Sequence, residues 1–418
     1  MSTIHIVGGK KLEGNIWLQG SKNAALPILA ATLLCDGVSI LENCPQIADV
    51  QEMLEILRDL GCKVWRVGKQ LCILAPSKLN QHIDRKHIIS MRSSIILLGV
   101  LLRENGFVSM EYPGGCVIGK RPIDMHILGL QKLGCEFEDS DTVLCARVRQ
   151  MKGTTIHLEF PSVGATENIV LAAVKAKGVT TIYGVAKEPE IVHLCSFLNQ
   201  CGAKIQGAGT DCIHIEGVAE LRACQYKIPS DRIVAGTYIM SALATKGSIT
   251  IENAPVSELE KVLSILESMG ANIDYENEIL YVSYEKPLQA VHLETDVYPG
   301  FPTDLQSPML VLLSQAEGWG SIRENIYENR FRIVSELEKM NAQMSLSGNQ
   351  VTTYGQAKLM GTQVLAKELR GNAALIMAGL VAEGETIVSD CQYVKRGYED
   401  ICRDLKSLGA IIYENEES

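Results

Sequence analysis

The strongest constraint on the fold is a short phrase that recurs six times, about 70 residues apart each time. Its pattern is Leu-x-x-apolar-Gly-small-x-apolar, and one copy has asparagine in place of glycine. The phrase predicts the end of an amphipathic helix, a left-handed cap residue and a following strand, and asparagine tolerates that conformation best after glycine. The marker residues are Gly61, Gly134, Gly202, Gly270, Asn341 and Gly409.

A second phrase interleaves with the first, and it reads as an apolar helix closed by a glycine and followed by a strand. Two independent markers with one period indicate six structural units. The helices of this phrase are apolar nearly all round, as in residues 24–31, which indicates burial between other elements. We therefore predict an α/β fold of six βαβαββ units with buried helices. The second set of glycines is Gly37, Gly106, Gly178, Gly247, Gly318 and Gly384.

Bulk composition narrows the class of protein. With 418 residues, 46% hydrophobic and 21% charged, the chain has an ordinary globular composition. A net charge of -10 argues against a nucleic-acid partner, because binding phosphates needs surplus Lys and Arg. We expect no membrane span, since no uninterrupted apolar run reaches about 18 residues. The thirteen cysteines are scattered without Cys-x-x-Cys spacing, and the N-terminus has no signal-like apolar core, so we expect a cytoplasmic protein without a metal site.

One stretch, residues 113–124, has the composition of a ligand-binding loop. Three glycines and two prolines exclude a regular helix or strand, and glycine lets the backbone approach a ligand closely. The loop holds Cys116, and Lys120 and Arg121 follow it. Nearby cations favour a reactive thiolate. A glycine-rich surface turn that happens to hold a cysteine is the alternative interpretation of this stretch.

Four of the six loops that enter the apolar helices carry a cation. A helix N-terminus offers free N–H groups and a positive dipole, which favour anions. The Ser, Asp and Asn residues of these loops are explained as helix caps. The cations oppose the dipole, so we expect a bound anion to compensate them. They are Lys22, Arg92, Arg232 and Arg370.

The chain resembles the enolpyruvyl transferases from residue 6 to residue 399. The resemblance implies an inside-out α/β barrel in two globules, each of three βαβαββ units. One globule would be discontinuous, residues 1–20 plus 230–418, and the other would span 21–229 and carry the Cys116 loop. The motifs are Ser21-Lys22-Asn23-Ala24-Ala25, the Cys116 loop, and residues 162–166, 188–192, 301–304 and 327–331.

The resemblance also implies an activity. Enolpyruvyl would pass from phosphoenolpyruvate to the 3-hydroxyl of UDP-N-acetylglucosamine, with release of phosphate. This is the first committed step of peptidoglycan synthesis, and it supports cell-wall biogenesis, cell shape and division through the cell cycle. The partners would be these small substrates alone, with no cofactor or metal, no nucleic acid and no membrane. The sequence leaves the oligomeric state open, and we take a monomer as the default.

The resemblance assigns roles to individual residues. Cys116 would protonate the methylene carbon, and Asp304 would be the general base for the sugar hydroxyl. The phosphoenolpyruvate anion would need several cations. These cations are Lys22, Arg121, Arg370 and Arg396. The catalytic residues are Cys116, Asp304, Lys22 and Arg396. Asn23 would hold the sugar, and the nucleotide-sugar would contact Arg92, Arg121, Pro122, Ile123, Asp124, Met125, Ser162, Val163, Gly164 and Ile326.

Five positions depart from the family pattern, and three alternative functions stay open. An acceptor such as shikimate 3-phosphate is disfavoured by the Cys116 loop and by residues 162–166. The departures keep open a weakly active UDP-sugar-binding or regulatory paralogue. A structural repeat protein would not need so many cations beside Cys116 and Asp304. The departures are Ala48, Phe160, Glu368 in place of aspartate, Tyr393 and Lys395.

We predict that Cys116 is the most reactive thiol. Enolpyruvyl transferases of this kind are inactivated by the epoxide fosfomycin, which alkylates the loop cysteine. Mass spectrometry should locate one adduct, at Cys116, forming faster with UDP-N-acetylglucosamine present. Cys116→Asp should escape alkylation and keep turnover, because a carboxylic acid can also deliver the proton. An adduct on another cysteine, or full turnover by Cys116→Ala, would contradict this prediction.

Overall fold

The computed structural model describes residues 2–80, 83–112, 123–138 and 143–416. The chain forms two compact units. The terminal unit holds the described residues of 1–19 and 230–418, and the inserted unit holds those of 20–229. Among the described helices, none is long and apolar enough to cross a membrane.

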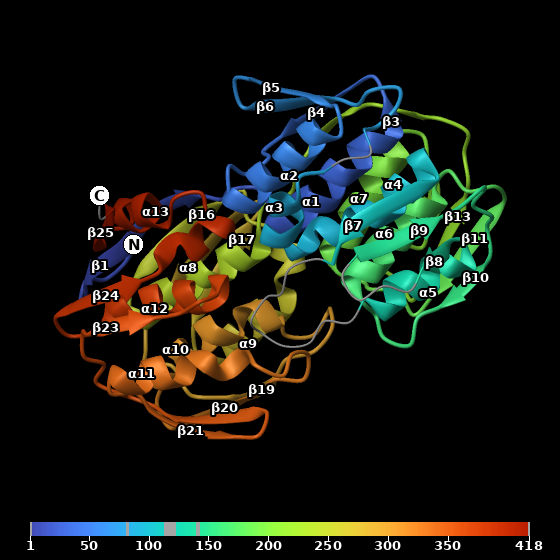
Figure 1. The fold of residues 1–418 in the computed structure, drawn as a ribbon. Coiled ribbons are helices and arrows are strands. Elements are labelled where there is room, and N and C mark those ends of the chain that lie inside the picture. Colours follow the sequence, from blue (N-terminus) through green and yellow to red (C-terminus); the bar gives the residue numbers. More distant parts are fainter. Residues whose placement is uncertain (1, 81–82, 113–122, 139–142, 417–418) are drawn as a thin grey trace. The chain divides into compact units, whose positions relative to one another are not determined.

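Three helices form the centre of each unit. In the terminal unit α8, α10 and α12 pack against one another, and in the inserted unit α4 packs against both α1 and α6 (Figure 1). These helices are buried because they are apolar all round, and in α8 every residue is buried. This confirms the predicted buried helices. Their bounds are α1 (Lys22–Ala31), α4 (Leu97–Asn105), α6 (Val163–Ala173), α8 (Arg232–Ala244), α10 (Gln306–Gln315) and α12 (Leu369–Val381).

Six further described helices are amphipathic, and each is followed, one or two residues after its end, by one of the predicted cap residues. All six of these residues have positive φ, from 71° at Asn341 to 104° at Gly270, which confirms the left-handed caps. A short additional helix, α3 (Arg85–Ser90), precedes the 3₁₀ turn η2 (Arg92–Ile96). The amphipathic helices are α2 (Ala48–Asp59), α5 (Asp124–Lys132), α7 (Pro189–Gln200), α9 (Glu260–Met269), α11 (Val334–Lys339) and α13 (Ile401–Ser407).

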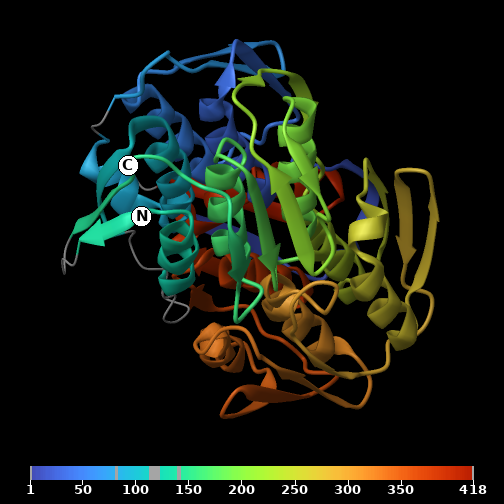
Figure 2. The ribbon, with the colours of Figure 1, turned by 90° about the vertical axis from the view of Figure 1, so that its right-hand side faces the viewer.

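Five four-stranded sheets share one topology. A short strand runs parallel to the strand that follows a buried helix, and two antiparallel strands complete the sheet. The sheet of β19 to β22 lies outside its helices at the lower edge of the terminal unit (Figure 2). The inserted unit contains β15 (Gln225–Lys227), β4 (Val38–Glu42), β6 (Gln70–Leu74) and β5 (Lys63–Val67), and β10 (Thr155–His157), β11 (Val179–Tyr183), β13 (Cys212–Glu216) and β12 (Lys204–Gln206).

The terminal unit contains the other three of these sheets, in the same topology. The inserted unit adds β7 (Phe107–Glu111), β9 (Val143–Arg147) and β8 (Glu136–Glu138), and the pair β3 (Cys35–Asp36) and β14 (Leu221–Arg222). The terminal sheets are β2 (Glu13–Trp17), β16 (Ser248–Glu252), β18 (Ile279–Ser283) and β17 (Asn272–Glu276); β19 (His292–Glu294), β20 (Trp319–Arg323), β22 (Gln350–Tyr354) and β21 (Gln343–Ser347); and β23 (Gln363–Leu365), β24 (Glu385–Ser389), β1 (Ser2–Val7) and β25 (Ile411–Glu416).

Segments far apart in the chain close each unit. Strand β2, just before the chain leaves the terminal unit, pairs with β16, which follows its return. Strand β15, just before the chain leaves the inserted unit, pairs with β4. The Ser21 N–H donates to the Pro229 carbonyl at 2.7 Å, and the Asp231 N–H donates to the Gln19 carbonyl at 3.0 Å. Each unit therefore joins its entering and leaving segments in one sheet.

Two glycines of the repeat have different physical roles, which substitution by alanine should separate. Gly202 has a φ of +103° with open space around it, so Gly202→Ala should cost about 1–2 kcal/mol of unfolding free energy through backbone conformation alone. At Gly247 the left-handed residue is the preceding Lys246, and an added Cβ would collide with the Leu12 carbonyl. Denaturant unfolding should show a larger loss for Gly247→Ala. Equal losses would contradict the distinction.

Candidate active site

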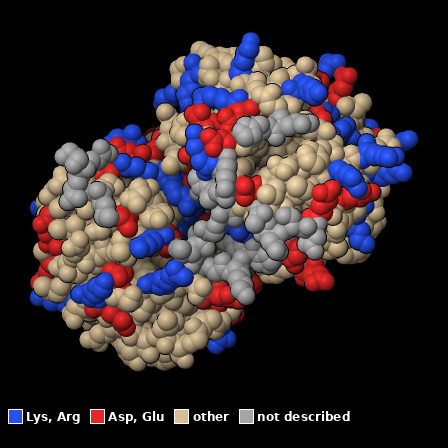
Figure 3. Space-filling view, in the orientation of Figure 1, with Lys and Arg blue, Asp and Glu red and all other residues tan. Residues whose placement is uncertain are grey.

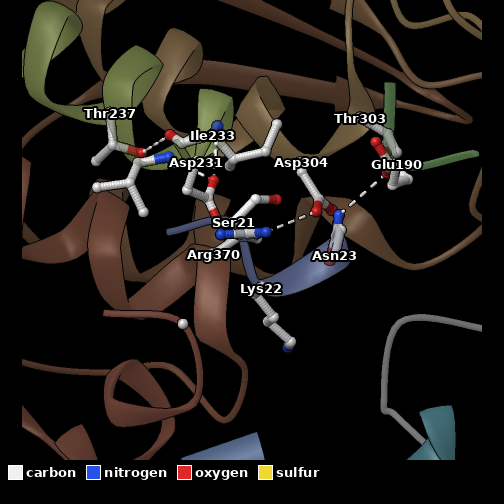
Figure 4. A network of polar contacts seen from close by, with 12 residues as sticks. Ser21, Lys22, Asn23, Glu190, Asp231, Ile233, Thr237, Thr303, Asp304 and Arg370 are labelled. Atoms are coloured by element: carbon white, nitrogen blue, oxygen red, sulfur yellow. Dashed lines mark hydrogen bonds and ion pairs between the residues drawn. The ribbon is translucent and has the colours of Figure 1, made fainter. Parts of the chain in front are cut away.

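The start of α1 carries two predicted site residues, each held by a carboxylate within the inserted unit. Ser21 caps the helix, and its hydroxyl accepts from the Ala24 N–H at 3.3 Å. The Lys22 ammonium lies 2.7 Å from the buried Asp49 carboxylate. Asn23 donates its amide N–H to Glu190 Oε1 at 3.4 Å (Figure 4). Both side chains are therefore oriented before any ligand binds.

A second group in the inserted unit surrounds His126. Burial, followed by the charge of Arg92, lowers the pKa of His126 to about 4 against a smaller opposing effect of Asp124. His126 is therefore neutral near pH 7, and its Nδ1 accepts from the Asn168 amide at 2.8 Å. A Cβ at Gly164 would lie 3.0 Å from the imidazole Cε1. His126 thus links the predicted Arg92, Asp124 and Gly164.

The remaining predicted residues of the inserted unit lie at two helix starts. Ser162 caps α6 by accepting from the Ala165 N–H at 3.3 Å, and Val163 is the first residue of that helix. Ile123 and Met125 flank the first residue of α5. Cys116, Arg121 and Pro122 lie outside the described residues, so their roles stay predictions.

In the terminal unit Asp304 lies between two arginines. It belongs to the 3₁₀ turn η4 (Thr303–Leu305). Arg370 Nη2 donates to Asp304 Oδ2 at 2.8 Å (Figure 4). Arg330 Nη2 donates to Asp304 Oδ1. The arginine side chains are 6% and 3% exposed, whereas the Asp304 side chain is 28% exposed. The carboxylate therefore pairs with two buried cations and keeps an edge open to solvent. Glu368 Oε2, 4.0 Å from Arg330 Nη1, adds a second negative charge.

The two arginines control the protonation of Asp304. Burial by itself would raise the pKa of Asp304, but the charges of Arg370 and Arg330 and their hydrogen bonds outweigh it and hold the pKa well below its usual range. Asp304 is therefore ionised near pH 7. Because its folded-state pKa is depressed, its contribution to stability is present above about pH 4 and is lost as the pH falls further.

The start of α12 places the other predicted residues of the terminal unit. Glu368 caps this helix and accepts from the N–H groups of Arg370, at 2.8 Å, and Gly371. The departure from aspartate thus keeps a working cap. Arg396 ends the 3₁₀ turn η6 (Cys391–Arg396), which packs against α12. Ile326 follows β20, and its N–H donates to Glu324 Oε1 at 2.8 Å.

The other departures lie away from the hydrophobic cores. Ala48 and Phe160 are exposed, and Tyr393 is half-buried. The Lys395 ammonium forms an ion pair of 2.7 Å with Glu414. None of these side chains replaces an apolar residue of the core.

Charges of both signs are interspersed over the visible face of each unit (Figure 3). In the described part of the chain, no group of three or more His, Cys, Asp or Glu side chains could hold a metal ion. Two of the four helix-start cations, Lys22 and Arg370, are paired with carboxylates of the protein. At these two positions a carboxylate of the protein compensates the cation, where the sequence had predicted a bound anion.

Comparisons with a family model and with solved structures show the class of protein to which the chain belongs. The family model of EPSP synthase (3-phosphoshikimate 1-carboxyvinyltransferase) matches residues 6–405. The chain therefore belongs to this family of enolpyruvyl transferases. The enolpyruvyl transferase NikO from Streptomyces tendae has a TM-score of 0.90 at 24% identity, covering 99% of both chains. EPSP synthase from Acinetobacter baumannii has a TM-score of 0.79 at 19% identity, covering 100% of both chains. These likenesses confirm the predicted fold class.

Full-length sequence relatives are more specific. A protein of Caldanaerobacter subterraneus subsp. tengcongensis is 45% identical, with 99% of both chains covered, and is named UDP-N-acetylglucosamine 1-carboxyvinyltransferase 2. The UDP-N-acetylglucosamine 1-carboxyvinyltransferase of Lawsonia intracellularis is 41% identical, with 100% of both chains covered.

We predict that Asp304 stabilises the terminal unit. Asp304→Asn leaves the buried charges of Arg330 and Arg370 without their shared counter-charge, which should cost about 3 kcal/mol of unfolding free energy. Asp274→Asn, on the exposed face of β17, is the matched control and should change stability by less than about 0.5 kcal/mol. Denaturant unfolding near pH 7 measures both. Equal stability of the two variants would show that the ion pairs contribute nothing.

Proposed function

We propose that this protein transfers enolpyruvyl from phosphoenolpyruvate to the 3-hydroxyl of UDP-N-acetylglucosamine and releases phosphate. The full-length relatives, 41–45% identical, support this acceptor. The observation that carries the chemistry is the ionised, partly exposed Asp304 held between two buried arginines. A carboxylate so fixed can accept a proton from a bound hydroxyl without first rearranging.

Phosphoenolpyruvate carries several negative charges, and its binding needs matching cations. Lys22, Arg121, Arg370 and Arg396 supply them in this proposal. The ammonium of Lys22 and the guanidinium of Arg370 are already oriented by Asp49 and Asp304. This preorganisation lowers the entropy cost of binding the anion.

Asp304 acts as the general base, and it accepts the proton only once the sugar oxygen has begun to bond to C2. Its lowered pKa makes it a weak base toward a free hydroxyl. As the sugar oxygen bonds to C2 of phosphoenolpyruvate, its proton becomes strongly acidic and passes to Asp304. Cys116 gives a proton to the methylene carbon in the same addition. The resulting tetrahedral phosphate ketal then loses a proton from its new methyl group together with phosphate, which restores the carbon–carbon double bond.

The nucleotide-sugar is held mainly by the inserted unit. Asn23 binds the sugar, and the helix starts at Asp124 and Val163 offer backbone N–H groups for its phosphates and carbonyls. Arg92, Arg121 and Ile326 complete the binding set. Neutral His126 keeps the Arg92 and Gly164 neighbourhood free of a further positive charge.

The proposal also covers cofactors, oligomeric state, location and domains. Lysine and arginine neutralise the substrate charge, so the mechanism uses neither a metal nor another cofactor. We further propose that the protein acts in the cytoplasm, with a monomer as the default oligomeric state, and supplies peptidoglycan synthesis for cell-wall growth and division. The terminal and inserted units are proposed to be the two domains of the enzyme, with 1–20 and 230–418 as one and 21–229 as the other.

The acceptor is testable with a phosphate-release assay. We expect release from phosphoenolpyruvate that depends on UDP-N-acetylglucosamine and not on shikimate 3-phosphate. The family model is named for the shikimate enzyme, but the EPSP synthase structures share under 20% identity and show the fold alone.

Release that responds to shikimate 3-phosphate instead would reverse the choice of acceptor. The absence of release with either acceptor, with nucleotide-sugar binding retained in calorimetry, would favour the regulatory paralogue.

A further inference from the structure

Glu324 is a buried carboxylate that directly follows β20 in the terminal unit. Its Oε1 accepts from the N–H groups of Ile326, at 2.8 Å, and Tyr327, at 3.0 Å. Its Oε2 accepts from the Thr303 hydroxyl at 2.9 Å. One side chain therefore fixes both the Ile326 segment and the turn that carries Asp304.

The connection continues to the reacting group. The Thr303 hydroxyl oxygen accepts from Arg330 Nε at 3.2 Å, and Arg330 donates to Asp304 through Nη2. An unbroken series of hydrogen bonds thus joins the Ile326 backbone to the Asp304 carboxylate. Its members come from η4, from the segment after β20 and from η5 (Arg330–Ile333).

The backbone of Glu324 is itself anchored. Its N–H donates to the Asn349 carbonyl at 2.8 Å, and its carbonyl accepts from the Asn349 side-chain amide at 3.0 Å. Asn349 lies in the turn between β21 and β22. A buried carboxylate is costly unless hydrogen bonds compensate it, and three donors do so here. The position of the carboxylate is therefore set by a sheet and not by a free loop.

We propose that Glu324 is a positioning residue that holds the acceptor-binding Ile326 segment at a fixed distance from Asp304. The inference rests on the proposed function, in which Ile326 contacts the nucleotide-sugar and Asp304 receives its proton. Glu324 touches neither substrate. Its loss should misplace the acceptor relative to Asp304 and leave the phosphoenolpyruvate cations in place.

Steady-state kinetics on the full-length enzyme tests this role. For Glu324→Ala we expect the KM for UDP-N-acetylglucosamine to rise about tenfold or more and kcat to fall, since a 1 Å displacement is costly to an oriented reaction. The KM for phosphoenolpyruvate should stay within about twofold of wild type. Glu324→Gln should recover most of the loss, because its carboxamide oxygen can still accept from both backbone N–H groups.

A second variant separates the two arms of the carboxylate. Thr303→Val removes the hydroxyl that links Glu324 to Arg330 and leaves the bonds to Ile326 and Tyr327. It should lower kcat several-fold with less effect on the KM for the nucleotide-sugar. It also keeps the test usable if Glu324→Ala does not fold. Glu338→Gln, an exposed carboxylate of α11, is the control for loss of charge.

The outcomes are distinguishable. Wild-type enzyme that is inactive with UDP-N-acetylglucosamine would refute the proposed function and this inference together. Active wild type with Glu324→Ala and Thr303→Val kinetics equal to those of Glu338→Gln would refute the inference alone. Equal increases in both KM values with a lowered melting temperature would show a merely structural role, which also overturns it.

Discussion

The terminal unit depends on one shared counter-charge. Arg330 and Arg370 are both almost fully buried, and a buried guanidinium needs a partner that repays its lost hydration. Asp304 serves both, and in doing so it ties η4, η5 and the start of α12 to a common point. The same carboxylate remains accessible at one edge. The interaction that permits the burial of two cations therefore also holds a reactive oxygen in a fixed place.

The inserted unit uses the same principle at the start of α1. Lysine at a helix N-terminus is disfavoured by the dipole, and Asp49 offsets this for Lys22. In each unit one helix-start cation, Lys22 or Arg370, is oriented by a protein carboxylate. An anionic substrate then meets preorganised charges, although it must compete with those carboxylates for them. The strength of anion binding follows from this balance and not from the number of cations.

Local features were predictable from the sequence, and long-range partners were not. The left-handed caps at Gly202 and Asn341 follow from a helix end and a following strand, which are encoded within a few residues. Asp49 lies 27 positions after Lys22, and Arg330 lies 26 positions after Asp304, so no spacing rule joins them. Arg330 belongs to the family motif of residues 327–331, which by itself indicates no partner for it. Five of the six glycines of the second phrase have positive φ, whereas at Gly247 the left-handed residue is Lys246 and the Leu12 carbonyl leaves no room for a Cβ.

The placement of β1 has a consequence for synthesis on the ribosome. This strand pairs with β24 and β25, whose residues begin at Glu385 and Ile411. Strand β1 therefore waits until β24 and β25 have been made before its sheet can form. The inserted unit is continuous in sequence and can close as soon as β15 emerges to pair with β4. Translation thus allows the inserted unit to form before β1 can pair with β24 and β25.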